Sequence, residues 1–182
     1  MPHRPWTRLG VVGIAGHLGY ELVWGVGVPL ASRVGVTTAT AGYAASSLAA
    51  YRAAGQLASP RGDRAFAVAN GLFLSAAVSH LSSWPRTTRA GLPWLVECEG
   101  LEGRLMGPYN ALLYVSAAAA VGGFMENRRA WAWFLLTPVI VVPLLRRETP
   151  REFQRLLDQA ADRPRWWNRR LAARTRRPVD SR

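Results

Sequence analysis

A histidine and a glutamate stand one helical turn apart inside a segment that is otherwise apolar. His17 and Glu21 belong to the stretch GHLGYELVW, residues 16–24, and side chains four residues apart lie on one face of a helix. A carboxyl group in an apolar site has a raised pKa and holds a proton near neutral pH. A neighbouring imidazole can orient it or relay its proton. The pair therefore predicts acid/base chemistry, and the structural alternative is a hydrogen bond that joins two helices.

A second acidic group precedes another apolar segment. Glu99 and Glu102 lie in VECEGLEGRLMGPYN, residues 96–110, and on a helix they would share one stripe with Asn110. We expect both carboxyl groups to act with the first pair as acids or bases. The alternative is that both lie in a hydrated loop, because Gly100 and Gly103 weaken a helix there. Aromatic ring faces can stabilise a carbocation. The expected substrate-binding residues are Tyr20, Trp24, Tyr109 and Asn110.

Four apolar segments are long enough to hold these residues within a bilayer. A membrane-spanning helix needs about 20 mostly apolar residues, and the candidates are residues 9–31, 65–84, 105–125 and 130–145. The sequence thus predicts an all-α integral membrane bundle of four transmembrane helices within residues 1–147. The Ala-rich stretch 38–54 is either an interfacial helix or a fifth span.

The remaining segment, residues 148–182, is a basic tail. All 23 basic residues of the chain are arginine, the net charge is +12, and twelve arginines follow Leu145. Arg-rich segments stay in the cytoplasm. Four spans then place the N-terminus, with His3 and Arg4, on the same side. We therefore expect a multi-pass protein of the cell membrane with both termini cytoplasmic.

Two patterns predict structure within the tail. Thr149-Pro150-Arg151-Glu152 is a capping box with proline at the first helical position, which predicts a helix start. Phe153, Leu156, Leu157 and Ala160 then form one apolar stripe. Trp166 and Trp167 stand among arginines and indicate a membrane-surface anchor, with a solvated amphipathic tail as the alternative.

This topology brings ionisable side chains from three segments to one depth near the cytoplasmic face. They are His17, Glu21, His80, Glu99 and Glu102. Ionisable groups within membrane segments usually face a cavity or a partner, so a shared polar cavity is predicted. For His80 and Glu97 we favour positions at the interface without a chemical role.

Two short motifs resemble known membrane enzymes. The stretch from His17 to Glu21 resembles the His-xxx-Glu motif of the emopamil-binding (EXPERA) sterol isomerases, and the stretch from Glu99 to Pro108 resembles their Glu-xx-Thr-xxxx-Gly-Pro element. GYELVW, residues 19–24, also resembles the Asn-xx-Trp-Glu motif of membrane-integral terpene cyclases from meroterpenoid pathways. Both resemblances imply that Glu21 is a catalytic acid and Glu99 a second acid or base. Glu102 stands where the isomerases have threonine.

The sequence therefore predicts an isomerase or cyclase that protonates an isoprenoid or sterol-like lipid to a carbocation. We expect no metal and no cofactor, and a homo-oligomer is left open. The positive charge fits a tail that faces anionic lipid better than a nucleic-acid partner. One alternative is a haem protein with His17 and His80 as axial ligands. The other is a small non-catalytic subunit of a larger complex.

Overall fold

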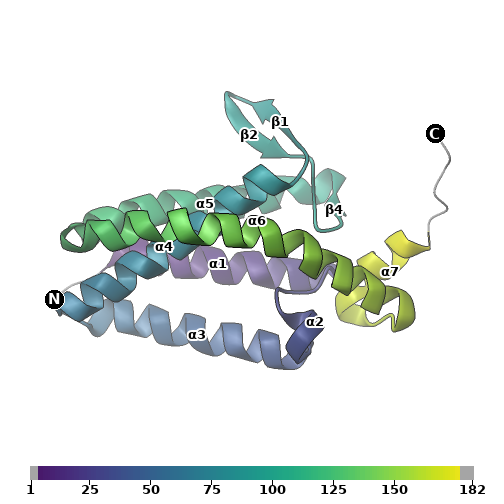
Figure 1. Ribbon diagram of the computed structural model, residues 1–182, viewed down its shortest axis with the longest axis horizontal. Coiled ribbons are helices and arrows are strands. Elements are labelled where there is room, and N and C mark those ends of the chain that lie inside the picture. Colours follow the sequence, from purple (N-terminus) through teal and green to yellow (C-terminus); the bar gives the residue numbers. More distant parts are fainter. Residues whose placement is uncertain (1–3, 177–182) are drawn as a thin grey trace.

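The computed structural model describes residues 4–176, and α-helices dominate it (Figure 1). His3 and residues 177–182 of the predicted tail lie outside this described part. The long helices are α1 (Pro5–Trp24), α3 (Val36–Gln56), α4 (Pro60–Ser83), α5 (Met106–Glu126) and α6 (Trp131–Asp162). The short helices α2 (Ala31–Val34) and α7 (Arg169–Thr175) lie at one end of the bundle. The predicted all-α fold is confirmed.

The boundaries of α1 have local causes. Pro5 occupies the first turn, where its missing N–H costs nothing. The Glu126 carboxylate accepts hydrogen bonds from the backbone N–H groups of Trp6, at 2.6 Å, and Thr7, at 3.0 Å. A negative group at this helix end also complements the helix dipole. Gly25 ends the helix in the left-handed conformation, with φ of 75°.

Small residues let the long helices approach closely. Helix α5 packs against α1 and α4, α4 also packs against α6, and α3 packs mainly against α1 at the edge of the bundle. A Cβ atom added to Gly71 of α4 would lie 2.6 Å from Cβ of Thr137 on α6. A Cβ atom added to Gly13 of α1 would lie 2.6 Å from Oγ of Ser116 on α5. Such contacts are typical of helices that associate inside membranes.

The polarity of the bundle is partly inverted relative to a water-soluble protein. Polar side chains that are buried inside include Thr7, Asn70, Ser75, Asn110, Ser116 and Asn127. Large apolar side chains that are exposed on α6 include Trp131, Trp133, Leu135, Leu136, Val139, Ile140 and Leu144. Two helical segments, Pro60–Ser83 and Arg128–Asp162, are long and apolar enough to cross a membrane.

Residues 38–54 form the middle of a full-length helix, α3, which runs alongside α1 (Figure 1). As a result, the beginning of α1 and helix α7 lie at opposite ends of the bundle. This arrangement does not fit a four-span topology with both termini on one side. The reason is that the stretch left open as an interfacial helix or a fifth span is a long helix, α3, which reverses the chain once more.

Helix α6 continues through the predicted tail boundary. It runs unbroken from Trp131 to Asp162 and contains Pro138, Pro143 and Pro150. The helix start predicted at Thr149 is therefore wrong, because the preceding turns are already helical. The predicted apolar stripe packs on the bundle: Leu156 and Ala160 are buried, and Phe153 and Leu157 pack against the core.

Two small hairpins connect α4 to α5. The first pairs β1 (Arg86–Arg89) with β2 (Leu92–Leu95), and it projects from the bundle (Figure 1). The second pairs β3 (Glu97–Cys98) with β4 (Leu101–Glu102). The shared helical stripe predicted for Glu99, Glu102 and Asn110 is wrong, because the two glutamates belong to this second hairpin and only Asn110 is helical.

Candidate functional site

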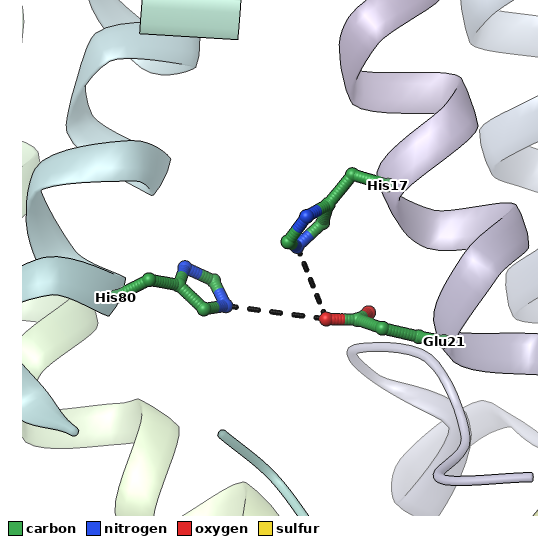
Figure 2. A group of neighbouring side chains, drawn as sticks. All are labelled: His17, Glu21 and His80. Carbon is green, nitrogen blue, oxygen red and sulfur yellow. Dashed lines mark ion pairs between the residues drawn. The ribbon is translucent and has the colours of Figure 1, made fainter. Parts of the chain in front are cut away.

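Four ionisable side chains from three parts of the chain meet near the end of the bundle that holds α2 and α7. Glu21 Oε1 lies 3.0 Å from His17 Nε2 on α1 and accepts a hydrogen bond of 2.9 Å from the Tyr109 hydroxyl on α5. His80 on α4 points toward the same oxygen, with Nε2 at 4.0 Å (Figure 2). Its Nε2 also lies 3.9 Å from Glu99 Oε1 at the tip of the β3–β4 hairpin.

The hydrogen bonding of His80 defines the state of its ring. Nδ1 lies 2.8 Å from the carbonyl oxygen of Ala76. Because a carbonyl oxygen only accepts, Nδ1 carries a proton. In the neutral ring the lone pair is then on Nε2, the nitrogen between the two carboxyl groups. His80 is thus oriented to take a proton from either glutamate.

The cluster is almost closed to solvent, and several of its buried polar atoms lack a hydrogen-bond partner. The side chains of His17 and Glu21 are 4% and 1% exposed, and those of His80 and Glu99 are 13% and 15% exposed. His17 Nδ1, Glu21 Oε2 and His80 Nε2 are buried with no hydrogen-bond partner among the described residues. Buried polar atoms are usually paired, so unpaired ones at one place indicate a functional site.

The Glu99 backbone is held in an unfavourable conformation. Glu99 and Gly100 form the two-residue turn of the β3–β4 hairpin, with φ of 48° and 88°. Such a turn favours Asn, Asp or Gly at its first position. A glutamate there is strained, and strain of this kind clusters at functional sites.

The strain places the Glu99 carboxyl group on the wall of a cavity. This Glu99 cavity has a volume of about 340 Å³. Its lining residues include Leu30, Leu145, Glu152, Phe153 and Leu156. Leu30 is also held at a positive φ of 67°. The wall is mainly apolar and also carries a few charged side chains, which is typical of a small-molecule site.

Burial changes the acidity of the groups on the hairpin. It raises the pKa of Glu99 to about 8, and the neighbouring Glu21 carboxyl group adds to this rise. Burial also raises the pKa of the Cys98 thiol well above its ordinary value, and Glu99 acts in the same direction. Glu99 therefore exchanges its proton near neutral pH, whereas Cys98 stays protonated.

The predicted site residues are brought together only in part. His17, Glu21, Glu99 and Tyr109 meet in the cluster, and Tyr109 is a hydrogen-bond donor within it. Glu102 is exposed and lines a separate cavity with Trp24.

Tyr20 and Asn110 have other partners. The Tyr20 hydroxyl donates to the carbonyl oxygen of Leu105 at 3.0 Å. The Asn110 amide forms a pair of hydrogen bonds with the backbone N–H and C=O of Leu95, at 2.9 and 3.0 Å. Asn110 thus fixes the end of β2 and does not line the Glu99 cavity.

Two members of the site were not given a role in the acid/base chemistry predicted from the sequence. His80 was assigned to the interface, yet its ring contacts that of His17 edge to face, with the centroids 5.0 Å apart. Cys98 is fully buried, with its sulfur 3.2 Å from the Tyr109 hydroxyl. The sequence did contain a signal for the role of His80, because an ionisable residue in an apolar segment needs a partner.

The same side chains could hold a metal ion. One ligand atom from each of His17, Glu21 and His80 can be chosen so that all three lie within 4.8 Å of one another (Figure 2). Two imidazoles and a carboxylate are a common donor set for zinc and iron. The bond from His80 Nδ1 to a backbone carbonyl is also the usual support of a metal-binding histidine.

Comparisons with known proteins found no family model, no curated protein and no solved structure that matches this chain.

Proposed function

We propose that the protein is a membrane-embedded acid/base enzyme that isomerises or cyclises an isoprenoid or sterol-like lipid. One observation carries this proposal: His80 Nε2 lies between a buried and a partly buried carboxyl group, 4.0 Å from Glu21 and 3.9 Å from Glu99. Both separations exceed a hydrogen bond and suit transfer through one water molecule or after a small closure. The motifs that resemble those of sterol isomerases and terpene cyclases point to the same chemistry.

In the proposed mechanism, Glu99 is the group that touches the substrate. It lies on the cavity wall, whereas the cavity lining does not include Glu21. Neutral Glu99 gives its proton to a carbon–carbon double bond, and the carbocation later loses a proton from a neighbouring carbon to the Glu152 carboxylate on the same cavity wall. Glu152 passes this proton to solvent, and solvent supplies the proton that replaces the one given by Glu99. The protons therefore balance over one turnover. His80 exchanges a proton between Glu99 and the His17–Glu21 pair, which restores the acid at the cavity.

The membrane topology is part of the same proposal. Two helices are apolar enough to span, and α1, α3 and α5 are comparable to them in length. Exposed apolar side chains lie on each of the three, such as Val12, Leu48 and Val121. We propose five spans, with the Arg-rich end that holds α7 in the cytoplasm and the N-terminus on the other side. The acid/base cluster then lies near the cytoplasmic face.

The test is product formation from isoprenoid and sterol candidates in heavy water. We expect the product to carry one solvent deuterium. Glu99→Gln should lower turnover by about 10²–10⁴-fold, because an amide cannot supply the proton. Asp158→Asn is the matched control, since Asp158 is an exposed carboxylate on α6 that lies outside the cluster and the cavity lining. Turnover of folded Glu99→Gln within a few-fold of wild type would remove Glu99 from the mechanism.

A metal centre at His17, Glu21 and His80 is the second candidate, and the convergence of three ligand atoms favours it. In that case Glu21 would be a metal ligand instead of a proton donor, and the metal would supply Lewis-acid chemistry. Elemental analysis of the purified protein separates the two candidates. A metal centre requires one ion per chain that is lost in His80→Ala. A haem between the two histidines is disfavoured, because their rings are already in contact.

A further inference from the structure

A second cavity is lined by the same β3–β4 hairpin that carries Glu99. This arginine cavity has a volume of about 590 Å³ and is formed by the end of α1, the hairpin and helix α7. Its lining includes Trp24, Glu97, Glu102, Arg169, Arg170 and Arg174. Three guanidinium groups against two carboxylates give the wall a net positive charge.

Helix α7 is firmly seated at this cavity. The backbone N–H of Arg170 donates to the carbonyl oxygen of Gly25 at 3.0 Å. A Cβ atom added to Gly25 would lie 2.7 Å from Cγ of Arg169, and one added to Gly100 would lie 2.9 Å from Cδ2 of Leu171. Both glycines have positive φ, at 75° and 88°. The two glycines let α7 approach, so the arginines have fixed positions.

The arginines differ in what they already bind. Arg169 donates to the carbonyl oxygens of Trp166 and Val23, and Arg174 pairs with Glu97. The Arg170 guanidinium carbon lies 5.8 Å from the centre of the Trp24 ring. Nε of Arg170 is buried and has no hydrogen-bond partner among the described residues. Arg170 thus offers a charged donor, and Arg169 retains further N–H groups, because a guanidinium carries five.

We propose that the arginine cavity binds the phosphate or diphosphate group of an amphiphile. Guanidinium groups match phosphate oxygens in charge and geometry. The cavity volume exceeds what a phosphate fills, and the Trp24 ring offers an apolar wall for the first carbons of the attached chain. A phosphate group here would lie at the end of α1, one helical turn beyond Glu21.

The experiment measures binding to the full-length protein in detergent with three probes: farnesyl diphosphate, farnesol and inorganic pyrophosphate. Farnesyl diphosphate should bind at least ten-fold tighter than farnesol, and raising the salt concentration should weaken its binding. Arg170→Gln should weaken binding by about ten- to a hundred-fold, as expected for a lost charged hydrogen bond. The matched control is Arg176→Gln, which removes the same charge from α7's exposed end outside the cavity.

The outcomes separate the sources of the phosphate. Pyrophosphate that binds as tightly as farnesyl diphosphate would identify a site for a free anion rather than an amphiphile, and would overturn the proposal. Equal binding of farnesol, or binding that is insensitive to salt, would also overturn it. The salt test requires no variant, and the charge-retaining Arg170→Lys should preserve most of the affinity. Glu21→Gln should bind farnesyl diphosphate normally, so this proposal and the proposed function can fail separately.

Discussion

His80 Nε2 lies 3.9 Å from Glu99 Oε1, although the two residues belong to different elements, the last turns of α4 and the tip of the β3–β4 hairpin. Helix α4 orients the ring through the Ala76 carbonyl, and the strained turn orients the carboxyl group. The backbone at two separate places, in α4 and in the hairpin turn, therefore orients the base and the acid toward each other. This relationship makes His80 the link between the cavity and the buried Glu21.

The first prediction concerns this link. His80→Ala should lower turnover by about 10²–10⁴-fold without unfolding the protein, because the exchange of protons between Glu99 and Glu21 is lost. Added imidazole should restore part of the rate by diffusing into the space left by the ring. The measurement is the steady-state rate with and without imidazole. If activity survives in His80→Ala at nearly the wild-type level, Glu99 works alone and no relay exists.

The second prediction concerns pH and stability. Burial raises the pKa of Glu99 from 4.5 in the unfolded chain to about 8 in the folded protein. The folded state then binds this proton more tightly, so the unfolding free energy should fall as pH rises from about 4.5 to about 8. The contribution is fully present below the lower value and lost above the higher one. Glu99→Gln should remove this part of the pH dependence in thermal unfolding measurements. Parallel curves for the two proteins across this range would show that Glu99 has an ordinary acidity.

The sequence predicted that the ionisable residues of the site meet, but it did not predict the path of the helices that bring them together. Ionisable residues in apolar segments need partners, and this rule alone brought His17, Glu21 and Glu99 together. The path of the chain depended on α3, whose many alanines and few large apolar residues match an interfacial helix as well as a span. With α3 included, the cluster lies where α1 ends, although the sequence placed it where the first segment begins.

The local errors have a common physical cause. Glu99 and Glu102 were assigned to a helix by spacing, yet Gly100 and Gly103 adopt positive φ and form a hairpin and a turn. Pro150 indicated a helix start, but it lies inside α6, which continues through it although an interior proline removes one backbone hydrogen bond. In both places the local sequence pattern was present, but the structure formed by the neighbouring residues decided which element it became part of.

The third prediction tests the close packing of α4 on α6. Gly71→Ala should lower the unfolding free energy by about 1–3 kcal/mol, because the new methyl group would overlap with Thr137. Gly19→Ala on α1 is the matched control, since a Cβ atom there meets nothing within 4 Å. The control should gain about 0.5–1 kcal/mol from helix propensity. Thermal unfolding in one detergent compares them, and equal stability of both variants would contradict the observed helix contact.

The fourth prediction concerns the pair of hydrogen bonds between the Asn110 side chain and the Leu95 backbone. Asn110→Leu removes both side-chain partners of a buried backbone N–H and C=O, which costs about 1–3 kcal/mol for each unsatisfied group. The loop that holds Cys98 should then open more often. Cys98 is fully buried in the folded protein, so its rate of alkylation reports this opening. We expect faster alkylation of Cys98 in Asn110→Leu. An unchanged rate would show that these two hydrogen bonds do not hold the hairpins in place.

The fifth prediction decides between five spans and four. In a five-span protein the beginning of α3 faces the cytoplasm and its end faces the opposite side, whereas a four-span protein has both on the outside. Cysteines introduced at Val34 and Ala58, which are exposed, should therefore react with a membrane-impermeant thiol reagent from opposite sides of the membrane. The wild-type protein is the background control, because its single cysteine is buried. Labelling of both positions from the outside would place α3 on the membrane surface. It would also return the N-terminus to the cytoplasm, because removing one span reverses the orientation of α1.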